Sequence, residues 1–136
     1  MAHPSPAEDR AEIHDLLSRF AFLADDGDLA DLGALFAADG VWESGRVTWH
    51  GREEIVAGLG KYRADGLAGP GSGVRHVVTT VEVGIDGPER AHARCYVLVT
   101  GTAEDAAARL TLVGQYQDVL RREDGAWRFG HRRFVP

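Results

Sequence analysis

The stretch Arg75-His-Val-Val-Thr-Thr-Val-Glu-Val83 opens the half of the chain that decides the fold. It is rich in β-branched residues, which is typical of a strand with one face packed on a core. Similar segments follow at residues 90–101, 109–122 and 126–135. Turn residues separate them, at 86–88, 102–105 and 123–125. The sequence therefore predicts a meander of consecutive antiparallel strands from residue 74 onward.

Upstream of these strands the sequence predicts helices. Ser5-Pro-Ala-Glu8 has the residues of a capping box, so the first helix is expected to begin near Pro6. Apolar residues then recur at helical spacing, and Gly27 marks the end of the helix. Asp28 is the expected N-cap of a second, shorter helix. Its apolar face would consist of Leu29, Leu32, Leu35 and Phe36.

The middle of the chain links these helices to the strands. Residues 41–49 are aromatic and β-branched, and they predict a short strand pair or an irregular strand. Gly51-Arg-Glu-Glu-Ile55 predicts the start of a third helix. Residues 66–73 contain four glycines and one proline, which predicts a flexible loop or lid. Helices first and strands later indicate an α+β fold in which three helices cover one face of the sheet.

Length and composition exclude several classes of protein. The 136 residues fit one domain with a core of its own, spanning residues 1–136. The net charge of -6 argues against a nucleic-acid partner. No segment is apolar for long enough to predict a membrane span, and the N-terminus does not have the pattern of a secretory signal, so a cytoplasmic location is expected. The single cysteine, Cys95, is interpreted as core packing.

Six short motifs, taken in order, carry a resemblance to a known family. They are Phe20-x4-Asp25-x-Gly27-Asp28, Leu35-Phe36-x2-Asp39-Gly-Val41, Gly51-Arg-Glu-Glu-Ile55, Arg75-His76, Gly114-x-Tyr116-x-Asp118 and Asp124-Gly-x-Trp127-Arg128.

With these motifs, nearly the whole chain resembles the SnoaL-like branch of the nuclear-transport-factor-two-like superfamily, nearest its scytalone-dehydratase and bile-acid-dehydratase group. The resemblance implies a cone, a curved antiparallel sheet packed on three N-terminal helices in a cystatin-like roll, with a pocket inside. It also implies that Asp25 and His76 share acid/base work. Those enzymes tend to carry a tyrosine where this chain has Phe20, so one hydroxyl is missing here.

The residues themselves suit that chemistry. A proton abstraction beside a carbonyl, or an elimination of water, needs a base and an acid close together in a dry pocket. Asp25 would orient the imidazole of His76 and stabilise its cation, while His76 would carry the proton. Both residues also have a non-catalytic interpretation. The Asp25 carboxylate would then be a solvated acid at a helix end, and the His76 ring would hydrogen-bond to a backbone carbonyl.

Further side chains are candidates for the pocket wall and for substrate binding. Strand alternation places Thr80 on the same side as His76. Of Gln115 and Tyr116, one should point inward, and alternation alone does not decide which. By the resemblance, the segment that carries Trp42, Glu43 and Trp49 borders the cavity entrance, although Glu43 is also interpretable as an exposed acid. The expected substrate-binding set is Phe20, Trp42, Glu43, Trp49, Thr80 and Tyr116.

These observations lead to one functional hypothesis and one alternative. The hypothesis is a cofactor-independent dehydratase, isomerase or cyclase, a lyase or isomerase acting on an apolar polyketide-, steroid- or terpenoid-like molecule. The alternative is a non-catalytic ligand-binding or scaffold protein of the same fold. The histidines are scattered without metal-ligand spacing, so no metal and no cofactor are expected. Apolar residues on the outer sheet face, near Tyr96, Val97 and Val99, predict a homodimer.

Overall fold

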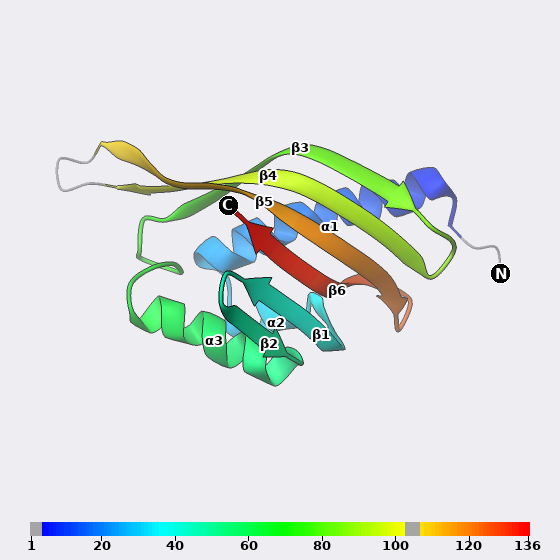
Figure 1. The fold of residues 1–136 in the computed structure, drawn as a ribbon, viewed down its shortest axis with the longest axis horizontal. Coiled ribbons are helices and arrows are strands. Elements are labelled where there is room, and N and C mark those ends of the chain that lie inside the picture. The colour runs from blue at the N-terminus through cyan, green and yellow to red at the C-terminus, as the bar shows by residue number, and fades with distance from the viewer. Residues whose placement is uncertain (1–3, 103–106) are drawn as a thin grey trace.

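The computed structural model describes residues 4–102 and 107–136. Along these residues the helices and strands follow in the order α1 (Pro6–Asp26), α2 (Leu29–Gly33), β1 (Phe36–Ser44), β2 (Val47–His50), α3 (Arg52–Ala64), β3 (Arg75–Ile85), β4 (Arg90–Thr102), β5 (Ala108–Glu123) and β6 (Ala126–Val135). The curved sheet covers α1, while α2 and α3 lie beside β1 and β2 (Figure 1). The predicted α+β class is confirmed.

The first helix begins as its sequence predicts. The Ser5 hydroxyl accepts a hydrogen bond from the backbone N–H of Glu8, and the Glu8 carboxylate accepts one from the backbone N–H of Ser5. This capping box satisfies backbone donors that have no partner within the helix. The predicted second helix is shorter than expected, because Phe36 already belongs to β1. The segment at 41–49 contributes to two paired strands, β1 and β2.

The sheet in the described part of the chain has the strand order β2-β1-β6-β5-β4-β3. The meander from β3 to β6 is antiparallel, and its bounds agree with the predicted strands. The pairing of β1 with β6 is parallel, so the sheet is mixed and the expectation of a purely antiparallel sheet is corrected. After β2, α3 carries the chain across to β3 at the far edge of the sheet. The predicted turn at 102–105 falls largely on residues 103–106, outside the described residues.

The core lies between the helices and the inner face of the sheet. Along β4, Ala91, Ala93, Cys95 and Val97 are buried, and their neighbours point outward. These side chains belong to the same core cluster as the apolar residues of α1, and the helix itself packs mainly on the neighbouring strand β3. Val97 and Val99 therefore do not lie on the outer face as expected, because alternation turns both inward. No helix in the described ranges is long and apolar enough to cross a membrane.

A bulge in β3 overturns one prediction of strand facing. The pairing with β4 shifts between Thr79 and Glu82, and Thr80 has a φ of 59°, a left-handed conformation that is rare for a β-branched residue. His76 and Val78 face inward before the bulge, and the extra residue shifts the inward positions after it to Val81 and Val83. Thr80 is exposed and does not share the wall of His76, so that expectation was wrong.

Candidate active site

A cavity of about 370 Å³ lies between the inner face of the sheet, the C-terminal part of α1 and the helix α3. Most of its wall is apolar or aromatic, which is typical of a small-molecule site. Residues from most parts of the chain contribute, including Phe20, Trp42, His76, Tyr116 and Phe134. Leu67 and Ala68 bring the predicted glycine-rich loop onto the same cavity. The aromatic rings and His76 thus face one shared space.

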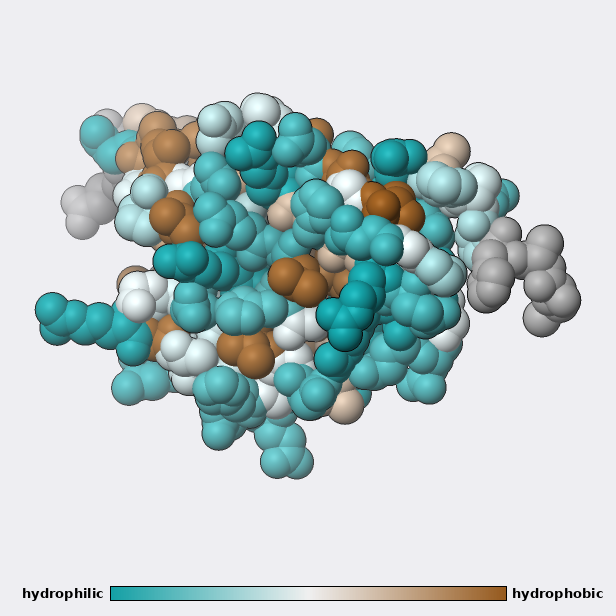
Figure 2. All heavy atoms as spheres, turned by 45° about the vertical axis from the view of Figure 1, so that its right-hand side comes forward, coloured by the Kyte–Doolittle hydropathy of each residue, from teal (hydrophilic) through white to brown (hydrophobic). Residues whose placement is uncertain are grey.

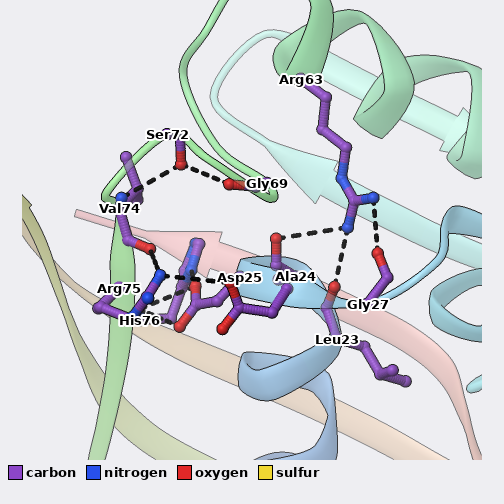
Figure 3. Close-up of polar contacts among 11 residues, drawn as sticks. Leu23, Ala24, Asp25, Gly27, Arg63, Gly69, Ser72, Val74, Arg75 and His76 are labelled. Carbon is purple, nitrogen blue, oxygen red and sulfur yellow. Dashed lines mark hydrogen bonds and ion pairs between the residues drawn. The ribbon is translucent and has the colours of Figure 1, made fainter.

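Asp25 and His76 meet at one side of this cavity. Asp25 belongs to the last turn of α1 and is only 4% exposed, and His76 lies near the start of β3. The distance between Asp25 Oδ1 and His76 Nδ1 is 2.7 Å. The backbone N–H of His76 also donates to Asp25, at 3.2 Å from each carboxylate oxygen. Figure 3 shows the carboxylate facing both groups.

This contact fixes how the imidazole is presented. Because the carboxylate can only accept, Nδ1 carries the hydrogen and the neutral ring has its lone pair on Nε2. His76 lines the cavity, and its Nε2 forms no hydrogen bond with the described residues. Asp25 stands behind His76 and is not part of the cavity wall. The arrangement presents one basic nitrogen, oriented by a buried carboxylate, to a largely apolar space.

Arg63 secures the helix end that carries Asp25. The last carbonyls of a helix have no partner within it, and the last turn of α1 contains no basic residue. Arg63, from α3, donates from Nη1 to the carbonyl of Gly27 at 2.7 Å and from Nη2 to that of Leu23 at 2.8 Å (Figure 3). Sequence reasoning missed Arg63, since nothing in its neighbourhood marks it as a partner of a helix 40 residues earlier.

The loop after α3 is organised by its own serine. The Ser72 hydroxyl donates to the carbonyl of Gly69 at 2.6 Å and accepts from the backbone N–H of Val74 at 3.1 Å (Figure 3). These bonds lead the chain directly into β3, two residues before His76. The predicted loop thus positions the start of the strand that carries the imidazole.

The remaining predicted wall residues divide into two groups. Phe20, Trp42 and Tyr116 line the cavity, and Trp49 lies one layer behind, stacked on Trp42 with ring centroids 6.1 Å apart. Of the pair that alternation left open, Tyr116 is the inward residue.

Glu43 belongs to the other group. It points away from the cavity, with Oε2 2.8 Å from Nε of Arg133 on β6 and Oε1 3.8 Å from Nε2 of His131. The parallel register places Glu43 opposite Arg133, which explains this orientation. The expectation that Glu43 lines the substrate cavity is therefore wrong, and its position matches the alternative of an acid outside the core.

Two buried groups beside the cavity have altered acidity. Burial raises the pKa of the Tyr116 phenol to about 12, against the opposing effect of the Arg132 guanidinium. Burial likewise raises the pKa of the Cys95 thiol to about 11. Both groups therefore keep their protons at neutral pH, so neither is a base or a nucleophile there. The interpretation of Cys95 as core packing is consistent with its complete burial.

Solved structures share this fold over most of their length. An NTF2-like protein with a cystatin-like fold from Novosphingobium aromaticivorans is 29% identical, with a TM-score of 0.82 over 94% of this chain and 81% of that one. A protein from Catenulispora acidiphila, solved in complex with S-DNPA, is 27% identical, with a TM-score of 0.77 and 94% of each chain covered. A candidate scytalone dehydratase from N. aromaticivorans is 21% identical, with a TM-score of 0.75 over 94% and 83% of the two chains.

A search of curated proteins finds no significant match to the sequence. The family model of the SnoaL-like domain, by contrast, matches residues 5–133, nearly the whole chain. Together with the shared fold, this match establishes the family of the chain. The chain is a member of the SnoaL-like domain family of the nuclear-transport-factor-two-like superfamily.

Proposed function

We propose that this protein is an acid/base enzyme that works without a cofactor on a small apolar molecule held in the cavity. His76 would be the proton carrier and Asp25 the residue that orients it. The reaction would be a dehydration, an isomerisation or a ring closure of a polyketide-, steroid- or terpenoid-like substrate. The observation that carries the proposal is the 2.7 Å contact between Asp25 Oδ1 and His76 Nδ1, which leaves Nε2 as the ring nitrogen toward the cavity.

All three reaction types share a first step that this pair can perform. Nε2 of His76 takes a proton from a carbon beside a carbonyl, and the electrons of the broken C–H bond move toward the carbonyl oxygen. The resulting imidazolium is stabilised by the carboxylate of Asp25. In a dehydration, the electrons return from the oxygen to form a C=C bond, the C–O bond of a leaving hydroxyl breaks, and the same proton is returned to that hydroxyl, so that water departs. In an isomerisation, it is returned to a different carbon. In a ring closure, the deprotonated carbon forms a C–C bond to a second carbonyl carbon, and the proton is returned to the oxygen of that carbonyl.

The wall residues support the substrate class. Phe20, Trp42 and Tyr116 present rings to the cavity, and Phe134 adds another from β6. Ring faces favour flat apolar molecules through area burial and stacking. A volume of about 370 Å³ lies at the lower end of the usual range for ligand pockets, which favours a compact substrate of a few fused rings.

The proposed step can be tested without knowing the natural substrate. The probe is 2-tetralone, a compact bicyclic ketone with exchangeable protons beside its carbonyl. We expect the protein to accelerate exchange of these protons for deuterium in D2O, followed by NMR. The His76→Gln variant should lose about 10²- to 10⁴-fold of that acceleration, the usual contribution of a general base.

A second histidine provides the matched control. His92 contacts Asp86 in the same way, Nδ1 to Oδ2 at 2.8 Å, but on the exposed outer face of the sheet. His92→Gln should leave the exchange rate unchanged. If 2-tetralone binds to the wild type but its exchange is no faster than with His76→Gln, the acid/base proposal fails. A ligand-binding role for the cavity would then be favoured.

We also propose that the working form is a homodimer joined through the outer face of the sheet. Val77, Leu98 and Val113 lie opposite one another on adjacent strands, and the two valines and nearby Tyr96 are exposed on this face. Exposed apolar rows of this kind are typical of subunit interfaces. The face drawn in Figure 2 is mostly hydrophilic, with separate hydrophobic patches. Light scattering that gives the mass of one 14.7 kDa chain at working concentration would overturn this proposal.

A further inference from the structure

A buried ion pair lies directly behind the cavity wall. Arg132 on β6 is 0% exposed, and its Nε and Nη2 donate to Asp118 Oδ1 and Oδ2 at 2.9 and 3.2 Å. The two residues are opposite one another in the pairing of β5 with β6. Burying two charges costs more than packing two apolar side chains of similar volume. The stability of the core does not require this pair, so its place behind the cavity wall indicates a role in the cavity.

The guanidinium of Arg132 lies against aromatic rings that also form the cavity wall. Its central carbon is 3.6 Å from the ring centroid of Tyr116 and 4.3 Å from that of Phe20. Nη1 is buried and has no hydrogen-bond partner among the described residues. The two contacts to Asp118 therefore use only part of the cation. The remaining positive charge faces the two rings, whose electron-rich faces attract it.

The hydroxyl of Tyr116 connects this cation with the cavity. Tyr116 is only 3% exposed, and its hydroxyl forms no hydrogen bond with any described residue. Yet it is not one of the buried polar atoms without a partner, which in the described residues are Trp42 Nε1, His131 Nε2 and Arg132 Nη1. Its remaining surface therefore opens into the cavity that Tyr116 lines. The phenol keeps its proton at neutral pH and can donate it in a hydrogen bond.

We propose that Tyr116 and Arg132 form a polar subsite for a substrate oxygen on which negative charge develops, such as an enolate or phenolate oxygen. The Tyr116 hydroxyl would be the contacting donor. Arg132 would be a positioning residue that acts through the ring, because a cation against the ring face strengthens the phenol as a donor in a cavity of low polarity. The inference rests on the proposed function, since the proton taken by His76 leaves this charge on the carbonyl oxygen.

The subsite can be tested by binding alone, with 4-nitrophenol as the probe. Its neutral and ionised forms absorb at different wavelengths, so the bound form is read directly by absorbance. At the pH where the free probe is half ionised, we expect the phenolate to exceed the phenol by about tenfold when bound to the wild type. That factor is the advantage of a hydrogen bond to a charged oxygen over one to a neutral oxygen.

Three variants separate the sources of this preference. Tyr116→Phe removes only the hydroxyl and should bring the bound ratio close to that of the free probe. The paired variant Asp118→Asn with Arg132→Gln removes both charges, leaves neither one buried alone, and should reduce the ratio several-fold. His76→Gln should largely retain the preference, because the subsite does not depend on the imidazole.

A second ion pair, largely buried, serves as the control for the paired variant. Arg122 contacts Asp9 at 2.7 Å and lies 4.6 Å from the ring centroid of Trp127, and none of these three residues lines the cavity. Asp9→Asn with Arg122→Gln should bind the phenolate as the wild type does. Equal changes in both paired variants would mean a general structural effect and would overturn the role of Arg132.

The remaining outcomes also decide the inference. It is overturned if the phenolate preference persists in Tyr116→Phe, if it disappears in His76→Gln alone, or if 4-nitrophenol does not bind at millimolar concentration. None of these results would refute the proposed proton transfer by His76, which is tested separately by the exchange of 2-tetralone protons. Conversely, loss of His76-dependent exchange with an intact phenolate preference would refute the proposed enzyme and leave the subsite as a property of a binding protein.

Discussion

The carboxylate of Asp25 holds His76 at two points, the ring Nδ1 at 2.7 Å and the backbone N–H at 3.2 Å. The ring contact sets the tautomer, and the backbone contact sets the position of the strand relative to the helix. Since the two residues are 51 positions apart, one buried side chain joins α1 to β3 at the cavity. Orientation of a histidine by a second group is a general device for making one ring nitrogen basic and available.

Replacing Asp25 by Asn should separate these two tasks. The amide oxygen can still accept the backbone N–H, but the imidazolium loses its counter-charge. We expect the rate of 2-tetralone exchange to fall by about 10²- to 10⁴-fold while circular dichroism stays unchanged. Asp26→Asn is the control, because Asp26 is exposed and its carboxylate, among the described residues, forms an ion pair with Arg75 alone, at 3.6 Å. Full activity of Asp25→Asn would show that His76 does not need this partner.

Phe20 should be a main contributor to the stability of the cavity wall. It is 1% exposed and lies between the ring of Trp42, stacked at 5.9 Å, and the guanidinium of Arg132. Phe20→Ala should lower the free energy of unfolding by about 3 to 5 kcal/mol, measured by denaturant titration. Phe22→Ala, two residues along the same helix, removes a side chain that is 74% exposed and should change it by less than about 0.5 kcal/mol. Similar losses in both variants would contradict this packing.

Tyr116 should make the fold sensitive to alkali. Its pKa is raised to about 12 in the folded protein, whereas an unfolded tyrosine titrates near 10. Between these values the unfolded chain has released the proton and the fold still holds it. Stability is therefore fully present below about pH 10 and falls as pH rises toward 12, by about 2 to 3 kcal/mol for this group.

The contribution of Tyr116 can be isolated by difference. The loss of stability between pH 9 and 12 should be smaller in Tyr116→Phe than in the wild type by about that amount. Parallel stability curves for the wild type and Tyr116→Phe would refute a raised pKa for Tyr116.

Cys95 should be unreactive in the folded protein. It is buried, and its pKa is raised to about 11, so at pH 8 the thiolate is roughly a hundredfold rarer than for a free thiol near 9. Because the chain has a single cysteine, labelling with a disulfide reagent reports this site alone. We expect labelling at least about a hundredfold slower in buffer than in guanidinium chloride. Rapid labelling of the native protein would mean that this part of the core opens readily.

Features that depend on neighbouring residues could be predicted from the sequence. The capping box at Ser5 and Glu8 and the long strands of the second half follow from local hydrogen bonding and side-chain alternation. His76 and Asp25 were predicted as a pair, and the structure places them in contact. That prediction came from a family resemblance, since helical periodicity alone put Asp25 at the border of the apolar stripe.

Other features exist only because distant segments meet. The bulge at Thr80 and the outward turn of Glu43 follow from how their strands pair with neighbours, which alternation within one strand does not determine. The approach of Arg63 to the end of α1 depends on where α3 lies. The sequence by itself thus determined the elements and their order. The tertiary structure alone decided which side chains share the cavity and placed the Arg132 cation behind its wall, because strand register and helix packing are set by the whole core.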